Sequence, residues 1–126
     1  MKKENVLKKK SFDFALRIVN LYKYMQDNKK EYIMSKQLMR SGTSVGATIR
    51  EAEYAESTND YIHKLSIAQK EINETLYWLE LLNASEYLTV QQFESINNDA
   101  VEVIKLITST IKTIKTKQQP QQQINN

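Results

Sequence analysis

Asp60 and His63 are the pair of side chains in this chain whose spacing comes nearest to a metal site. A carboxylate and a histidine three residues apart form one half of the ligand set in di-iron helical bundles. A complete centre needs a second pair, and His63 is the only histidine in the sequence. We therefore predict no metal ligands, and interpret Asp60 as a helix-capping residue and His63 as a surface residue.

Three glutamates are the remaining candidates for acid and base chemistry. Glu71 and Glu74 flank an apolar position, and Glu51 precedes them in the chain. Paired carboxylates could transfer protons, but the sequence places no nucleophile or phosphate-binding loop beside them and contains no cysteine. We therefore predict no catalytic residue and no cofactor. We expect the glutamates to form ion pairs, within the chain or across a subunit boundary, with Arg40, Arg50 or Lys70.

Positive charge is concentrated at the two ends of the sequence. Residues 1–40 hold 11 Lys or Arg against 4 Asp or Glu, residues 41–104 hold 3 against 11, and residues 105–126 add 4 lysines and no acid. This segregation favours either a polyanionic partner or head-to-tail contact between copies of the chain. The candidate nucleic-acid-binding residues are Lys2, Lys3, Lys8, Lys9, Lys10, Lys112, Lys115 and Lys117.

The composition is that of a soluble globular or bundle protein of one domain, with 126 residues, 40% of them hydrophobic and 26% charged. No apolar run approaches the roughly 20 residues that span a bilayer. The first residues include lysines but no apolar stretch of the kind found in signal peptides. We therefore expect a cytoplasmic protein without a membrane partner.

Apolar residues at steps of three and four predict four amphipathic helices over about 11–29, 34–55, 58–84 and 89–117. Ser11 is the expected N-cap of the first helix, and Ser57 and Thr89 begin capping boxes of the third and fourth. Short connections and the lack of strand-like alternation favour an all-α fold, an antiparallel up-down-up-down four-helix bundle. Residues 1–10 are expected to form a basic N-terminal segment and residues 118–126 a disordered tail.

The expected core faces follow from the same spacing. In the third helix the stripe is Leu65, Ala68, Ile72, Thr75, Leu79 and Leu82. In the fourth it is Phe93, Asn97, Ala100, Ile104, Ile107, Ile111 and Ile114. Tyr32 and Ile33, between the first two helices, are expected to fold over the end of the bundle.

The second helix has its expected core stripe at Leu38, Gly42, Val45, Ile49 and Ala52, and every residue from Ser41 to Thr48 except Val45 is small. Its two glycines, Gly42 and Gly46, are the only ones in the chain and lie four residues apart, on one side of the helix. Glycine inside a helix costs about 1 kcal/mol relative to alanine, so we expect close approach of a neighbouring helix in return. That neighbour belongs either to the same bundle or to another subunit. The candidates for helix packing or for an interface are Arg40, Ser41, Gly42, Ser44, Val45, Gly46, Ile49, Glu51, Glu71, Glu74 and Trp78.

Up-down topology determines where the charges gather. The start of the first helix and the end of the fourth share one end of the bundle, so we expect their lysines to form a lysine crown there. The link between the second and third helices reaches the same end, and its acids would neutralise part of the crown. A smaller basic group at the opposite end contains Lys29, Lys30, Lys36 and Arg40.

Residues 31–88 carry a more specific pattern than a generic bundle. Its positions are Tyr32, Gln37, Leu38, Arg40, Ser41, Ser44, Ala47, Ile49, Glu51, Tyr61, Leu65, Ile67, Ala68, Glu71, Glu74, Trp78 and Leu79. The pattern resembles the four-helix-bundle proteins encoded by intervening sequences in bacterial 23S ribosomal RNA genes, the S23-like family. Thr48 stands where that family usually has asparagine, and the first helix lacks the family's frequent Phe-Pro before the tyrosine.

The resemblance implies an antiparallel four-helix bundle, commonly assembled into a homopentameric ring and without established enzymatic activity. A more remote likeness, in fold and basic character only, is to the accessory variability proteins of diversity-generating retroelements, which work with a reverse transcriptase and RNA. The leading hypothesis is a non-enzymatic, oligomeric accessory factor that binds RNA or DNA phosphates through its lysines. The alternative is a protein-protein interaction scaffold with no nucleic-acid role.

Overall fold

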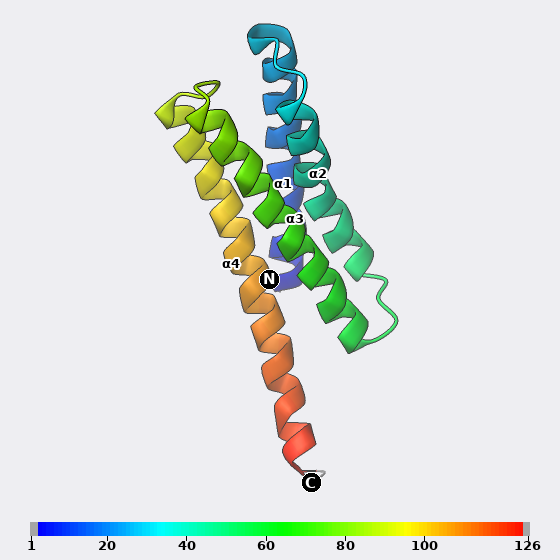
Figure 1. Cartoon of the computed structure of the whole chain (residues 1–126). Coiled ribbons are helices and arrows are strands. Elements are labelled where there is room, and N and C mark those ends of the chain that lie inside the picture. The colour runs from blue at the N-terminus through cyan, green and yellow to red at the C-terminus, as the bar shows by residue number, and fades with distance from the viewer. Residues whose placement is uncertain (1–2, 125–126) are drawn as a thin grey trace.

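The computed structural model describes residues 3–124, and over this range all regular structure is helical. The elements are α1 (Lys3–Tyr24), a π-helical turn η1 (Met25–Lys29), α2 (Met34–Ala52), α3 (Thr58–Ala84) and α4 (Val90–Ile124). Helix α1 packs against α2 and α4, and α3 packs against the same two helices. The α1–α2 and α3–α4 connections lie at one end of the molecule and the α2–α3 connection at the other (Figure 1). This confirms the predicted up-down-up-down bundle.

Helix α1 begins at Lys3, so the expected start at Ser11 is wrong. The hydroxyl of Ser11 is buried and donates to the carbonyl oxygen of Lys8 at 3.1 Å, inside the helix. Leu7 is fully buried and extends the core stripe of Phe14 and Ile18 toward the amino terminus. Residues 3–10 therefore belong to the bundle and do not form a separate basic segment.

The predicted core faces of the two central helices are confirmed. Every member of the α3 stripe is buried, as are the stripe residues of α2. Helix α2 ends at Ala52, three residues before the expected boundary. The N-cap of α3 is Ser57, whose hydroxyl accepts from the Asp60 N–H at 3.0 Å. Thr89 and Gln92 bond each other reciprocally at 2.9 and 3.1 Å, as a capping box requires.

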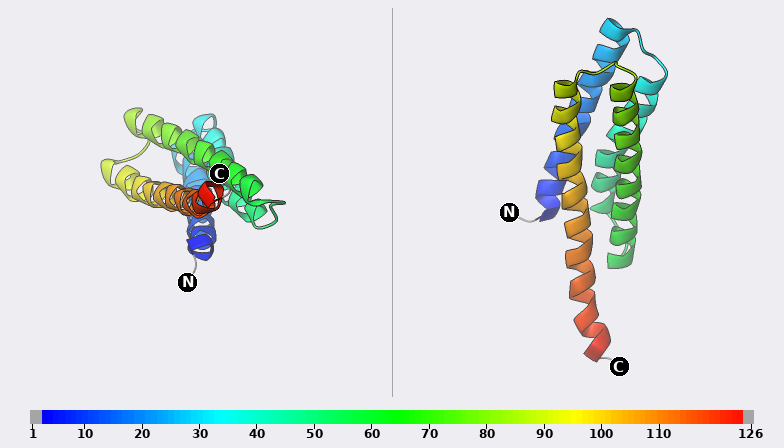
Figure 2. Two further views of the ribbon diagram at one scale, coloured as in Figure 1. Left: turned by 90° about the horizontal axis from the view of Figure 1, so that it is seen from below. Right: turned by 60° about the vertical axis from the view of Figure 1, so that its left-hand side comes forward.

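Helix α4 differs from expectation in its buried face and in its end. The buried residues are Ile96, Ala100, Val103, Ile107, Thr110 and Ile111, whereas Phe93, Asn97, Ile104 and Ile114 are half-buried. The face is rotated because α4 packs against α1 as well as α3. The helix continues to Ile124, so residues 118–124 of the expected tail are helical. Gln118 still contacts α3, donating to Asn59 at 3.2 Å, and the last turns run past the bundle (Figures 1 and 2). Glutamine is a good helix former.

The two glycines of α2 face α1 at close range. A Cβ atom added to Gly42 would lie 2.8 Å from Cγ1 of Ile18, and one added to Gly46 would lie 3.2 Å from the carbonyl oxygen of Ser11. The close neighbour predicted from the glycine stripe is therefore α1 of the same chain. Only a residue without a side chain fits at Gly42 while Ile18 keeps its place.

Candidate nucleic-acid interface

The lysines of α1 are largely engaged in ion pairs. Three of the predicted crown residues have a carboxylate partner: Lys8–Glu53 at 2.7 Å, Lys9–Asp13 at 2.8 Å and Lys10–Glu102 at 3.0 Å. The hydrogen bond and the charge of Glu102 raise the pKa of Lys10. These pairs are exposed and individually weak. A phosphate group would nevertheless have to compete with a carboxylate at each of these lysines.

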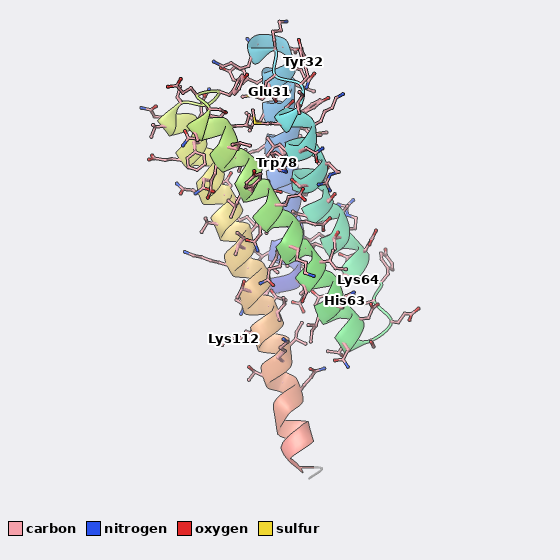
Figure 3. The ribbon with its side chains drawn as sticks, in the orientation of Figure 1. Glu31, Tyr32, His63, Lys64, Trp78 and Lys112 are labelled. Atoms are coloured by element: carbon pink, nitrogen blue, oxygen red, sulfur yellow. The ribbon has the colours of Figure 1, made fainter. Side chains whose placement is uncertain are left out.

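The lysines of α4 have a different environment. Lys105, Lys112 and Lys115 are exposed, and among the side chains described, up to residue 118, none has a carboxylate within 4.0 Å. Lys112 and Lys115 line a hollow of about 530 Å³ between α3 and α4, which Gln69 bridges by donating to Thr108 at 3.0 Å. Figure 3 shows Lys112 on the part of α4 that runs beside the start of α3. We call these residues, Lys105, Lys112 and Lys115, the α4 lysine strip; it presents exposed lysines that form no ion pair with the described side chains.

The predicted crown is thus divided. The ammonium group of Lys3 donates to the Thr113 hydroxyl at 3.1 Å, which places the start of α1 beside the end of α4 as expected. Lys117 lines a separate hollow of about 790 Å³ together with Glu4 and Glu53. Lys2 lies outside the described residues. Because two carboxylates face the hollow beside Lys117, it is less suited to a phosphate than the α4 lysine strip.

The carboxylates on this end hollow also affect its tyrosine. Tyr61 lines the hollow beside Glu4 and Glu53. Burial, and then the charges of the two glutamates, raise the pKa of the Tyr61 hydroxyl. The Tyr61 hydroxyl therefore gives up its proton less readily than the hydroxyl of a fully exposed tyrosine.

Polar pairs join α2 to α3 where acid and base chemistry was considered. The pairs are Arg40–Glu74, Thr48 to Glu71 at 2.7 Å, and Thr75 to Ser41 at 3.0 Å. The expected ion pair is confirmed for Glu74 with Arg40. For Glu71 no basic side chain lies within 4.0 Å among the described side chains of this chain, and the carboxylate accepts from the Thr48 hydroxyl at 2.7 Å. Both glutamates therefore join α2 to α3.

Most of the other interface candidates pack or form hydrogen bonds within the bundle. Val45 and Ile49 are buried in the core, and the Ser44 hydroxyl donates to the Arg40 carbonyl at 2.6 Å. Trp78 is half-buried and makes an edge contact with Tyr77, with ring centroids 5.0 Å apart. The indole nitrogen of Trp78 is buried without a hydrogen-bond partner. Glu51 is exposed at the edge of a hollow between α1 and α2.

Asp60 and His63 take the structural roles assigned to them. Asp60 lies in the first turn of α3, where its carboxylate accepts from the Glu56 N–H at 3.1 Å. His63 is exposed one turn further along α3 (Figure 3). Within residues 3–124 no group of three or more His, Asp or Glu side chains is placed to hold a metal ion. No helix in that range is long and apolar enough to cross a membrane.

An apolar surface between α1 and α2 was not predicted from the sequence. Phe12, Leu16 and Tyr54 are more than half exposed. Phe12 and Tyr54 line a hollow of about 440 Å³ whose walls are mostly apolar. The guanidinium group of Arg50 lies 5.8 Å from the centre of the Phe12 ring. The signal in the sequence was that Phe12 and Leu16 fall outside the α1 core stripe.

Glu31 was also missed, and it holds the α1–α2 connection together. Its buried carboxylate accepts hydrogen bonds from the backbone N–H groups of Ile33 and Met34 at 3.0 Å and of Ser35 at 2.7 Å. Burial by itself would raise the pKa of Glu31, but the hydrogen bonds from the Met34, Ser35 and Ile33 N–H groups outweigh it, so the pKa lies below its usual value. This carboxylate caps the first turn of α2.

These features define the class of protein. It is an all-helical four-helix bundle with an exposed strip of lysines, in which Glu71 and Glu74 join α2 to α3. The family model described as 23S rRNA-intervening sequence protein matches residues 3–109, and the chain belongs to this family. A crystal structure of a protein of unknown function from the S23 ribosomal protein family of Bacteroides thetaiotaomicron is 61% identical, with a TM-score of 0.87. The match covers 88% of this chain and 99% of that one. The search of curated proteins found no match.

Proposed function

We propose that this protein is a non-enzymatic, oligomeric accessory factor that binds the phosphate groups of RNA through the α4 lysine strip. The observation that carries the proposal is that Lys105, Lys112 and Lys115 are exposed without a carboxylate partner among the described side chains. Lysines bind phosphate as point charges, largely independently of base sequence. The 23S ribosomal RNA connection in the family's description supports RNA as the partner.

Assembly of several copies would strengthen this binding. One chain supplies a short strip of lysines, and each phosphate contact is weak and sensitive to salt. A ring of copies, a pentamer if the family pattern holds, would present several strips to one RNA molecule. Linked contacts of this kind raise avidity steeply. The polar pairs around Glu71 and Glu74 use these carboxylates to join helices, which supports a role without catalysis.

Replacing Lys112 and Lys115 by glutamine is expected to weaken binding to structured RNA. The slope of log affinity against log salt concentration is negative, and each lost phosphate contact should make it shallower by about 1. The measurement is fluorescence anisotropy of a labelled RNA hairpin titrated with protein at salt concentrations from about 50 to 200 mM.

The matched control is the double variant Lys8→Gln and Lys10→Gln, which removes the same charge from lysines that already have carboxylate partners. It should change the salt slope less than the α4 variant does. Equal effects of the two variants would show that overall charge, and not the α4 lysine strip, determines binding. Absence of RNA binding at low salt would refute the proposed function.

The second candidate function, a protein-protein scaffold, is favoured by the apolar surface between α1 and α2. Exposed aromatic and aliphatic side chains of this kind are typical of interface cores. Its predicted role is contact between copies of the chain, and the charged edge formed by Arg50 and Glu51 would set the orientation. This role is compatible with RNA binding, because the two surfaces lie on different helix pairs.

Replacing Phe12 and Leu16 by serine is expected to shift the protein from oligomer toward monomer. Both side chains are more than half exposed, so the fold should remain intact while the buried area of the interface falls. Multi-angle light scattering after size-exclusion chromatography measures the change. The control is Val90→Ser, an equally exposed apolar residue at the start of α4. A wild-type monomer at tens of micromolar would contradict the oligomer.

A further inference from the structure

The connection between α1 and α2 presents an exposed aromatic ring among lysines. Tyr32 is 47% exposed and Ile33 is 80% exposed, so the expectation that they fold over the bundle end is wrong. Lys29, Lys30 and Lys36 are exposed in the same segment. Figure 3 places Tyr32 at the end of the molecule where α1 and α2 meet, far from Lys112. We call this group, Lys29, Lys30, Tyr32 and Lys36, the tyrosine-lysine loop.

Hydrogen bonds to η1 and to the first turn of α2 hold the loop in place. The Glu31 N–H donates to the carbonyl oxygen of Met25 at 3.0 Å, and Lys30 adopts the left-handed conformation with φ 53°. The Ser35 hydroxyl donates to the Glu31 carbonyl at 2.8 Å and accepts from the Gln26 amide at 2.9 Å. A ring presented on such a preorganised loop loses little conformational entropy when it binds a partner.

The charge of the loop favours an anionic partner. Residues 23–36 contain four lysines and two acids, a balance of +2. One of these acids is Glu31, whose carboxylate points inward to three N–H groups. Among the described side chains no lysine of the segment has a carboxylate within 4.0 Å, and Lys29 lies 5.9 Å from the centre of the Tyr24 ring. The remaining acid, Asp27, leaves the surface with a positive excess.

We infer that the tyrosine-lysine loop binds single-stranded RNA, with the Tyr32 ring stacked on an unpaired base and the lysines contacting the adjacent phosphates. Stacking platforms flanked by basic residues bind single strands with little sequence preference. A duplex keeps its base faces stacked and cannot use the ring in this way. The inference rests on the proposed function for its partner class, but concerns a separate site at the other end of the bundle.

An anionic membrane is the competing partner, and the loop fits it less well. Membrane attachment by insertion would depend on Ile33, the most exposed apolar side chain of the loop. Burying one or two side chains in lipid gives only marginal binding, whereas one ring is enough to stack one base. Substitution of Ile33 should therefore affect membrane binding, and substitution of Tyr32 should affect RNA binding.

The test measures anisotropy of a labelled single-stranded RNA of about 10 nucleotides, a length that binding sites of this kind accommodate. Tyr32→Ala is expected to weaken binding about 5- to 100-fold, the loss typical of one stacked base. Tyr32→Phe keeps the ring and should stay within about twofold of wild type. The matched control is Tyr77→Ala, which removes a tyrosine of α3 that is 55% exposed and lies outside the tyrosine-lysine loop, and it should leave single-strand binding unchanged.

Further measurements show which of the two sites, the α4 lysine strip or the tyrosine-lysine loop, binds each RNA. The double variant Lys112→Gln and Lys115→Gln should weaken binding to the RNA hairpin more than binding to the single strand. Tyr32→Ala should weaken binding to the single strand more than binding to the hairpin. Single-strand binding that is unchanged by Tyr32→Ala while hairpin binding depends on the α4 lysine strip would overturn this inference and leave the proposed function standing. Absence of binding to either RNA overturns both. Binding to phosphatidylserine vesicles that Ile33→Ser abolishes, without Tyr32-dependent RNA binding, would assign the loop to a membrane.

Discussion

Replacing Gly42 by leucine is expected to lower the free energy of unfolding by about 3 kcal/mol or to prevent folding. A Cβ atom at this position already falls 2.8 to 3.1 Å from three carbon atoms of Ile18, which is fully buried. The longer leucine side chain would force α1 and α2 apart along their whole contact. Urea denaturation followed by far-ultraviolet circular dichroism measures the loss.

Alanine variants of the two glycines provide the control for this prediction. Alanine gains about 1 kcal/mol of helix propensity at either position. At Gly46 the nearest atom to the added Cβ is 3.2 Å away, so strain and propensity should nearly cancel. At Gly42 the overpacking cost of about 1 to 3 kcal/mol should exceed the gain. A Gly42→Ala variant more stable than wild type would contradict the close contact.

A double-mutant cycle identifies Ile18 as the cause. Ile18→Ala removes the three carbon atoms that meet the added Cβ, so it should relieve the strain of Gly42→Ala while creating its own cavity. The two substitutions together should then cost less than the sum of the single variants, by about 1 kcal/mol. Additivity within about 0.5 kcal/mol would mean that the strain has another source.

The fold was predictable because the two central helices repeat their core positions at steps of three and four along their whole length. The α3 stripe from Leu65 to Leu82 is buried throughout, and glycine spacing alone indicated the close approach at Gly42. The ends of the outer helices were less accessible to sequence reasoning. Ser11 has the residue type of an N-cap, but a serine hydroxyl can also bond back within a helix. Burial of Leu7 decides between these options, and burial depends on tertiary contacts.

The end of the bundle at which the α1 and α4 lysines gather was predictable, but the ion pairs that these lysines make were not. Topology placed the lysines of α1 and α4 at one end, as the contact between Lys3 and Thr113 shows. Which lysines meet a carboxylate depends on the rotation of each helix about its axis. The α4 face toward α1 carries Glu102, which reaches Lys10, while Lys112 points elsewhere. A charge count along the sequence contains no information on that rotation.

Glu31→Gln is expected to destabilise the protein by about 1.5 to 3 kcal/mol, the range for hydrogen bonds to a charged group. The carboxylate accepts from three N–H groups at the start of α2, and an amide has one acceptor oxygen in place of two. At least one buried N–H group then lacks a partner. The charge that favours a helix N-terminus is lost as well. Urea denaturation at neutral pH, with the exposed Glu80→Gln as the matched control, measures the effect.

The pH dependence of this difference tests the mechanism. The pKa of Glu31 in the folded protein lies below its value of about 4.3 in an unfolded chain. Its contribution to stability is therefore fully present above the unfolded pKa and is lost as the pH falls through the folded pKa. Wild type and Glu31→Gln should differ most near neutral pH and converge in acid, whereas Glu80→Gln should stay close to wild type throughout. A difference that persists unchanged into acid would mean that the glutamate acts through its shape and not through its charge.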